Sequence, residues 1–274
     1  PPPPLSILAH IVAAALAGGV ISTLAAAFTL SLGPAWISRL VSFAVGALLG
    51  AVFLEMLPHA LEEGDAKHVI ATDMGGTSFD VGLAFFLLEK LVLWRHSHGH
   101  EELDDAGDES EHDHAMHAHG HGHDQGRSGL MILIGNSVHN FCDGIVIAAS
   151  FLADPALGLA ATLAIVAHAV PQQVGDFAVL LHSGYTRRRA FALNVATGCA
   201  TLAGALGAYF ALADMQQALP TVLAIAAASL LYVAVADLIP SLHRRPEPLE
   251  TAKQSLLIAA GIGVIAAVHA LLAH

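Results

Sequence analysis

The sequence has few charged residues and few cysteines. Lys, Arg, Asp and Glu make up 12% of its 274 residues, about half of the roughly 25% found in soluble domains. This shortage excludes an ordinary soluble enzyme, and a hydrophobic content of 55% excludes disorder over most of the chain. A formal net charge of −12 also excludes a basic nucleic-acid-binding protein. Cys142 and Cys199 both lie inside apolar runs, so no disulfide framework is expected.

Long apolar runs account for most of what is present. Eight of them are each close to the roughly 20 residues that cross a bilayer as a helix. They are too long for the strands of a membrane barrel and lack the alternation that such strands need. In lipid their backbone amides can be satisfied only within a helix. We therefore predict an all-α membrane protein with eight transmembrane helices. The predicted spans are 6–32, 36–60, 75–94, 129–153, 157–183, 188–213, 217–241 and 252–273.

The basic residues predict how these helices cross the membrane. With the N-terminus outside, ten of the eleven Lys and Arg fall on the inner side and Lys67 alone on the outer side. This asymmetry is typical of the inner face of a membrane. We expect an integral protein of a bacterial plasma membrane, with both termini outside.

One hydrophilic insert holds most of the charge. From 96 to 126 the chain has nine Asp or Glu, nine His, and no Lys or Arg. We predict a disordered cytoplasmic loop over 96–127, between helices one to three (1–95) and helices four to eight (128–274). Alternating histidines and acids are a metal-binding composition. A solvated linker with no role of its own is the alternative interpretation.

A short motif occurs twice. The second span ends in E-M-L-P at 55–58 and the seventh in D-L-I-P at 237–240. In the predicted orientation these helices run in opposite directions, which favours an inverted-repeat transporter bundle. The alternative is that each proline ends a helix and each acid lies near the interface.

The fourth span carries polar residues at its centre. His139 and Asp143 are four residues apart and share a helix face, with Asn140 on the flank. An ionised Asp near mid-membrane costs at least about 2.5–3.5 kcal/mol. Such a group needs a cation, a partner or a water-filled cavity.

The fifth span carries a matching stripe. His168, Gln172 and Asp176 repeat every four residues, and Pro171 removes a helical hydrogen bond and predicts a kink. Because the link between the two spans is only 154–156, we expect them to be antiparallel neighbours whose polar residues meet at one depth. Imidazole, carboxylate and amide oxygen together suit Zn²⁺, Fe²⁺, Mn²⁺ or Cd²⁺.

We therefore predict an intramembrane metal site. Taken singly, each residue is more often structural: a packed histidine, a buried counter-ion, or an amide joining two helices. Two such stripes at matched depth favour metal binding. The candidate ligands are His139, Asn140, Asp143, His168, Gln172 and Asp176. In the sixth span, Asn194, Thr197 and Thr201 also share a face; they either line the same cavity or form a helix–helix seam, and the seam is the favoured interpretation.

Two motifs resemble those of the ZIP family of divalent metal transporters. H-N-F-C-D-G at 139–144 resembles the family's H-N-F-x-D-G, and H-A-V-P-Q-Q-V-G-D at 168–176 resembles its H-E-x-P-H-E-x-G-D. The resemblance implies a binuclear site on helices four and five, a homodimer, and an elevator-like motion of helices one, four, five and six against the others. This chain departs from the pattern at Ala169, Gln172 and Gln173, where acids or His are usual. We therefore expect a single, less anionic metal site.

The expected function is import of a divalent metal into the cytoplasm, with zinc the first candidate and iron, manganese or cadmium the others. The metal is the transported substrate, and no organic cofactor or nucleic acid is expected. An intramembrane metalloprotease would need H-E-x-x-H, but His139 is followed by Asn and His168 by Ala. A metal sensor with little transport, or an exporter, are the alternatives.

Overall fold

The computed structural model describes residues 5–29, 34–63, 127–242 and 248–272, and within these ranges all regular structure is helical. The predicted third span and all but the last residue of the predicted 96–127 loop lie outside the described residues. The elements are α1 (Leu5–Leu16), η1 (Ala17–Ile21), α2 (Ser22–Thr29), α3 (Pro34–Gly50), η2 (Ala51–Met56), α4 (Leu57–Glu63), α7 (Arg127–Ala153), α8 (Pro155–His182), α9 (Arg187–Leu212), η4 (Gln216–Ala218), α10 (Leu219–Tyr232), η5 (Val233–Leu238), α11 (Ile239–Leu242) and α12 (Pro248–Leu272).

Seven stretches of helix within the described residues are long and apolar enough to cross a membrane. Each overlaps one of the predicted spans, so the prediction of a helical membrane protein is confirmed. The spans are Ser6–Phe28, Trp36–Glu62, Ile132–Ala153, Pro155–His182, Arg187–Leu212, Gln216–Ala236 and Leu249–Leu272.

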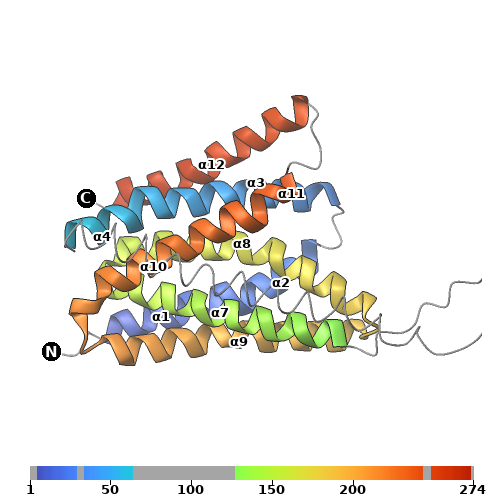
Figure 1. The fold of residues 1–274 in the computed structure, drawn as a ribbon, viewed down its shortest axis with the longest axis horizontal. Coiled ribbons are helices and arrows are strands. Elements are labelled where there is room, and N and C mark those ends of the chain that lie inside the picture. The colour runs from blue at the N-terminus through green and yellow to red at the C-terminus, as the bar shows by residue number, and fades with distance from the viewer. Residues whose placement is uncertain (1–4, 30–33, 64–126, 243–247, 273–274) are drawn as a thin grey trace, which may run out of the picture.

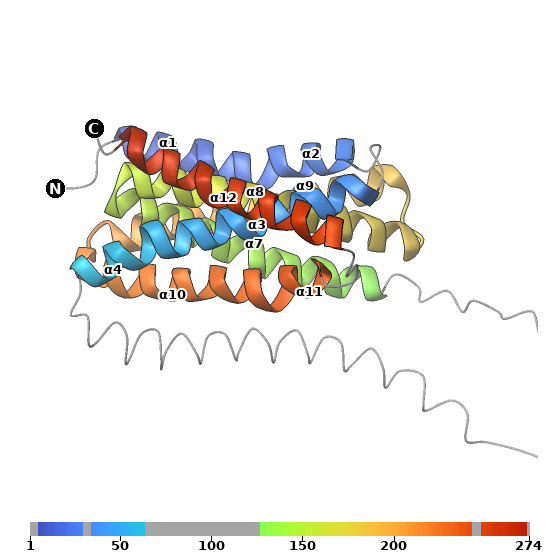
Figure 2. The same cartoon turned by 90° about the horizontal axis from the view of Figure 1, so that it is seen from above.

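Helix α8 occupies the middle of the bundle. It packs against α2, α3, α7 and α12 (Figure 2). Asp154 begins it as an N-cap, since its Oδ1 accepts hydrogen bonds from the amides of Ala156 (2.8 Å) and Leu157 (3.1 Å), and Pro155 is well placed in the first turn. Because α7 ends at Ala153, this tight link makes α7 and α8 the antiparallel neighbours that were predicted.

The helices on either side of α8 form two layers. In Figure 1, α3 and α12 lie above α8, and α1, α7 and α9 lie below it. The N-terminal ends of α3, α7, α9 and α12 all lie at one end of the bundle. The start of α1 and the end of α12 both lie at the opposite end, in different layers.

Glycines bring α7 and α9 into backbone contact. A side chain on Gly144 of α7 would overlap the carbonyl oxygen of Thr201, and one on Gly204 of α9 would overlap that of Phe141. Small residues permit this approach between membrane helices, where packing and hydrogen bonding replace the hydrophobic effect. The two helices are therefore held together along their length.

Close backbone contacts at glycines also occur elsewhere, in two separate groups of helices. Gly19 of η1 meets the backbone of Gly198, which joins the first span to α9. On the other side of the bundle, Gly46 of α3 meets the carbonyl of Ile258, and Gly261 of α12 meets the backbone of α3. In the described part of the chain, no glycine of one group makes such a contact with the other.

The repeated acid-x-x-Pro motif has the same backbone form in both copies. η2 and η5 are six-residue π-helices with the acid at the fifth position, and the α-helix that follows each has proline as its second residue. A proline lacks the N–H that the carbonyl four residues earlier would accept, which favours a wider turn there. The chain stays helical through both prolines, so neither of them ends its helix. Because α3–α4 and α10–α11 run in opposite directions (Figure 1), the structure supports the inverted pair.

Candidate metal centre

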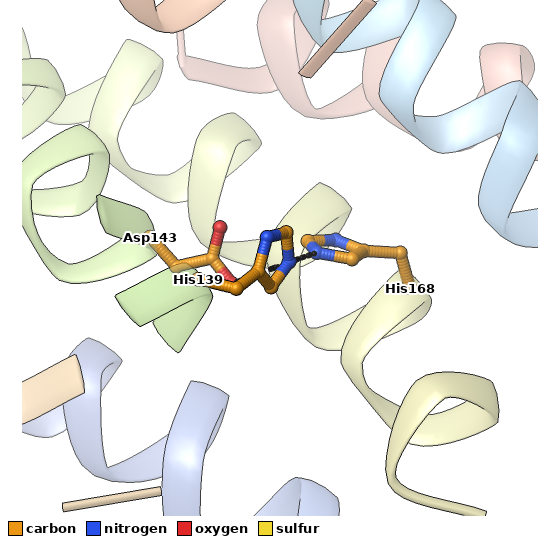
Figure 3. A group of neighbouring side chains, drawn as sticks. All are labelled: His139, Asp143 and His168. Atoms are coloured by element: carbon orange, nitrogen blue, oxygen red, sulfur yellow. Dashed lines mark hydrogen bonds and ion pairs between the residues drawn. The ribbon is translucent and has the colours of Figure 1, made fainter. Parts of the chain in front are cut away.

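Three side chains from α7 and α8 converge on one point (Figure 3). Nε2 of His139 lies 3.3 Å from Nε2 of His168, and each of these nitrogens lies 3.5 Å from Oδ2 of Asp143. Ligands held about 2.0–2.1 Å from a tetrahedral Zn²⁺ lie about 3.3–3.4 Å from one another. The three atoms therefore have the spacing of three corners of a zinc coordination shell.

The cluster is buried at mid-height in the bundle. Asp143 is 4% exposed and His168 1% exposed, while His139 is half-buried. Asp143 is the twelfth residue of the 22-residue span Ile132–Ala153. Its ion-pair partners within the described ranges are the two imidazoles. A carboxylate so far from water requires compensation by a bound cation or a protonated imidazole.

The backbone of α8 sets the tautomer of His168. Its Nδ1 lies 3.2 Å from the carbonyl oxygen of Ala164. A carbonyl oxygen only accepts hydrogen bonds, so Nδ1 carries the proton and Nε2 presents a lone pair to the cluster. In the neutral imidazole this lone pair is open to a bound cation.

Two other predicted ligands stand at different distances from the cluster. Asn140 lies in the same turn of α7 as His139, is 2% exposed, and has no hydrogen-bond partner for its Nδ2 among the described residues. Asp176 is half-buried on α8, eight residues after His168 and hence about 12 Å further along the helix. It does not belong to the three-residue cluster. Ligand roles for both residues stay predictions.

Gln172, also a predicted ligand, takes part in a chain of hydrogen bonds beside the cluster. Its Nε2 donates to Oδ1 of Asn136 (3.0 Å), and Nδ2 of Asn136 donates to Oγ1 of Thr197 (3.4 Å). The hydroxyl of Thr197 donates to the backbone carbonyl of Asn194 (2.8 Å). No pattern in the sequence indicates this pairing, because side-chain partners across a helix interface depend on how each helix is rotated about its axis. α8 stays helical through Pro171 as far as His182.

The polar stripe of α9 forms a seam between helices, as the favoured interpretation predicted. Thr197 joins α9 to α7 through Asn136, and Nδ2 of Asn194 donates to the backbone carbonyl of Gln173 on α8 (3.4 Å). Thr201 is buried where its backbone meets Gly144. The stripe therefore holds α9 to the two helices that carry the cluster.

These features define the class of the protein. It is a polytopic helical membrane protein with a buried cluster of two imidazoles and one carboxylate, midway along the spanning helices, that is suited to a divalent metal ion. The sequence profile described as ZIP Zinc transporter matches residues 4–269. The chain belongs to the ZIP zinc transporter family.

Among curated proteins, the chain is similar to zinc transporters. It is 32% identical over 245 residues to zinc transporter ZIP13 of Pongo abelii, covering 84% of this chain and 66% of that protein. The ZIP13 of Homo sapiens is 31% identical over 264 residues, with 84% and 70% covered. Zinc transporter ZIP4 of Homo sapiens is 38% identical over 118 residues, 43% of this chain and 18% of that protein. All three of these relatives are zinc transporters.

Proposed function

We propose that the protein carries divalent metal ions, zinc foremost, across the membrane into the cytoplasm, and that the ion binds between His139, Asp143 and His168. The observation that carries this proposal is the spacing of 3.3–3.5 Å between the three donor atoms at the middle of the bundle. Two imidazole nitrogens and one carboxylate oxygen also suit Fe²⁺, Mn²⁺ and Cd²⁺. The metal is the substrate, so the proposal includes no organic cofactor and no enzymatic reaction.

The site is proposed to hold one ion weakly. Ala169, next to His168, is 3% exposed and offers no ligand atom, and Gln172 brings an uncharged amide and no carboxylate. Asp143 is thus the one carboxylate in the cluster. A divalent cation there keeps a net positive charge in a low-dielectric setting, which favours release.

The distribution of glycine contacts supports alternating access by an elevator-like motion. In this proposal, helices α1, α2, α7, α8 and α9 move as one unit against α3, α4, α10, α11 and α12. Backbone contacts at glycines lie within each unit, whereas the described contact of α8 with α3 is apolar: Val170 and Val174 pack beside Ile37 and Leu40. Two smooth apolar surfaces can slide without breaking hydrogen bonds.

Charge supports the proposed orientation. Arg127 and the arginines at 187–189 lie in the first turns of α7 and α9, and Arg39 and Lys253 lie in the second turns of α3 and α12. The starts of these four helices gather at one end of the bundle. We place that end, and with it the 96–127 loop, in the cytoplasm of a bacterial cell, and both termini outside. As the family resemblance implies, the functional assembly is proposed to be a homodimer.

A flux measurement tests this function. Purified protein in liposomes that enclose a zinc-sensitive dye is expected to give saturable zinc entry driven by a zinc gradient. A sensor would bind zinc without flux, and an exporter would move zinc only outward in vesicles of known orientation. Either of those two results would overturn the proposal.

Restoring the acid that is usual beside His168 should strengthen metal binding. Ala169→Glu is expected to lower the zinc Kd about tenfold, or about 1.4 kcal/mol, and to slow turnover, because a second carboxylate stabilises the ion and delays its release. Isothermal titration and single-turnover efflux would measure the two effects. Ala169→Gln has the same size without the charge and should leave the Kd nearly unchanged; equal affinity in both variants would contradict the argument.

A further inference from the structure

The hydrogen-bond chain beside the metal cluster links the same two helices that carry it. Asn136 lies three residues before His139 on α7, and Gln172 lies four residues after His168 on α8. The contact between the two amides, 3.0 Å from Nε2 to Oδ1, is therefore the next bridge between α7 and α8 after the contact between the two imidazoles. Asn136 is 6% exposed, so its hydrogen bonds are shielded from water.

The direction of each hydrogen bond in this chain of side chains follows from its last acceptor, a backbone carbonyl on α9. The backbone carbonyl of Asn194 can only accept, so the one hydroxyl proton of Thr197 points to it. Oγ1 of Thr197 can then only accept from Asn136, which must present its NH₂ group to α9. The carbonyl of Asn136 consequently faces α8 and requires the NH₂ group of Gln172. Each amide orientation follows from the one before it, back to the backbone.

Gln172, the first residue of this hydrogen-bond chain, also has a side-chain oxygen. Oε1 of Gln172 receives no hydrogen bond from the described residues, although its own amide nitrogen is anchored. The Gln172 side chain is only partly buried and lies one helical turn from His168. An amide held by its nitrogen presents its oxygen in a different direction, and a carbonyl oxygen is a neutral ligand for divalent metals.

We propose that Asn136 is a positioning residue, which with Thr197 turns the side-chain oxygen of Gln172 toward the His139–Asp143–His168 cluster and makes it the fourth, uncharged ligand of the ion. The inference rests on the proposed function for the identity of the bound ion. The hydrogen-bond chain would also affect which metal is preferred, because it holds a neutral oxygen ligand at this position. An imidazole there would favour softer ions, and a carboxylate would bind the ion more tightly. Loss of the anchor lets the amide rotate and removes the ligand without altering any group in the cluster.

A Co²⁺ titration of the purified full-length protein tests this directly, with visible absorption reporting the ligand set. Asn136→Ala is expected to weaken Co²⁺ binding about 10- to 100-fold, as loss of an orienting partner does at other metal sites, and to change the absorption band. Gln172→Leu is expected to do the same. In the Gln172→Leu background, Asn136→Ala should cause no further loss, because its effect acts through that side chain. Effects that multiply instead would overturn the inference.

Thr197 supplies a second, milder pair of variants. Thr197→Val keeps the shape but removes the hydroxyl, so the orientation of the Asn136 amide is no longer fixed and Co²⁺ binding should weaken. Thr197→Ser keeps the hydroxyl and should bind Co²⁺ as the unmodified protein does. Equal affinities for Val and Ser would overturn the inference, and this pair decides the question if Asn136→Ala does not fold. The titration needs no transport. Absent zinc flux with the expected Co²⁺ results would refute the transport proposal alone, and normal flux with multiplying effects would refute this inference alone.

Discussion

Replacing Asp143 with asparagine is expected to abolish zinc uptake. The substitution keeps the size of the side chain but removes the one carboxylate of the cluster, which lies 3.5 Å from each imidazole. Removing one partner from a buried charge pair costs about 3–5 kcal/mol, and this corresponds to a loss of metal affinity of about 100-fold or more. Zinc entry into proteoliposomes and zinc titration of the purified protein would both measure it. His139→Ala and His168→Ala are expected to have effects of similar size.

The same helix offers a control for the histidine substitutions. His182 ends α8 and is exposed, and its hydrogen bond among the described residues is local, since its Nδ1 lies 2.8 Å from the carbonyl oxygen of Ala178. His182→Ala should therefore leave zinc entry unchanged. If Asp143→Asn and His168→Ala proteins fold and still transport at the rate of the unmodified protein, the ion does not pass through this cluster and the site assignment is wrong.

Gly204→Ala is expected to have the largest effect on stability among conservative substitutions in α9. Its new methyl group would overlap the backbone carbonyl of Phe141, which cannot rotate away as a side chain can. Overpacking of this kind costs about 1–3 kcal/mol in soluble cores, so a lower unfolding temperature in detergent is expected. Since Phe141 lies in the turn between His139 and Asp143, zinc affinity should fall as well.

Gly207, three residues later on the same helix, provides the matched comparison. A methyl group there would meet no heavy atom within 4 Å. Alanine favours a helix over glycine by about 0.5–1 kcal/mol, so Gly207→Ala should be neutral or slightly stabilising. Equal unfolding temperatures for the two variants would show that α7 and α9 do not need their close approach.

The spans could be predicted because burial in lipid leaves the backbone no choice but a helix. The predicted 129–153 and 188–213 correspond to Ile132–Ala153 and Arg187–Leu212. The π-helices η1, η2 and η5 could not be predicted. In a uniformly apolar segment the sequence carries no periodicity to show where an α-helix widens, and a proline is compatible with either a helix end or a wider turn.

The cluster was predictable because two kinds of local information sufficed. A spacing of four residues placed His139 and Asp143 on one face, and the short link at Asp154 forced α8 to return alongside α7. Predicting the partner of Gln172 would need a third kind of information, the rotation of α8 about its own axis. Many packed side chains determine that rotation together. The sequence therefore placed Gln172 on the same face of the helix as His168 but could not tell that Asn136 accepts a hydrogen bond from its nitrogen.

The π-helices η2 and η5 also determine which way the side chains after them face. A π-turn contains one residue more than an α-turn, so η2 takes up an extra residue without changing the direction of the side chains that follow it. If the same residues formed a uniform α-helix, every side chain after them would rotate by about 100° around the helix axis. Glu55, which is buried and bonds His269 of α12 at 3.1 Å, would turn away from that partner. The wider turn in this half of the inverted pair thus keeps an acidic group facing the interior of the bundle instead of the surrounding lipid.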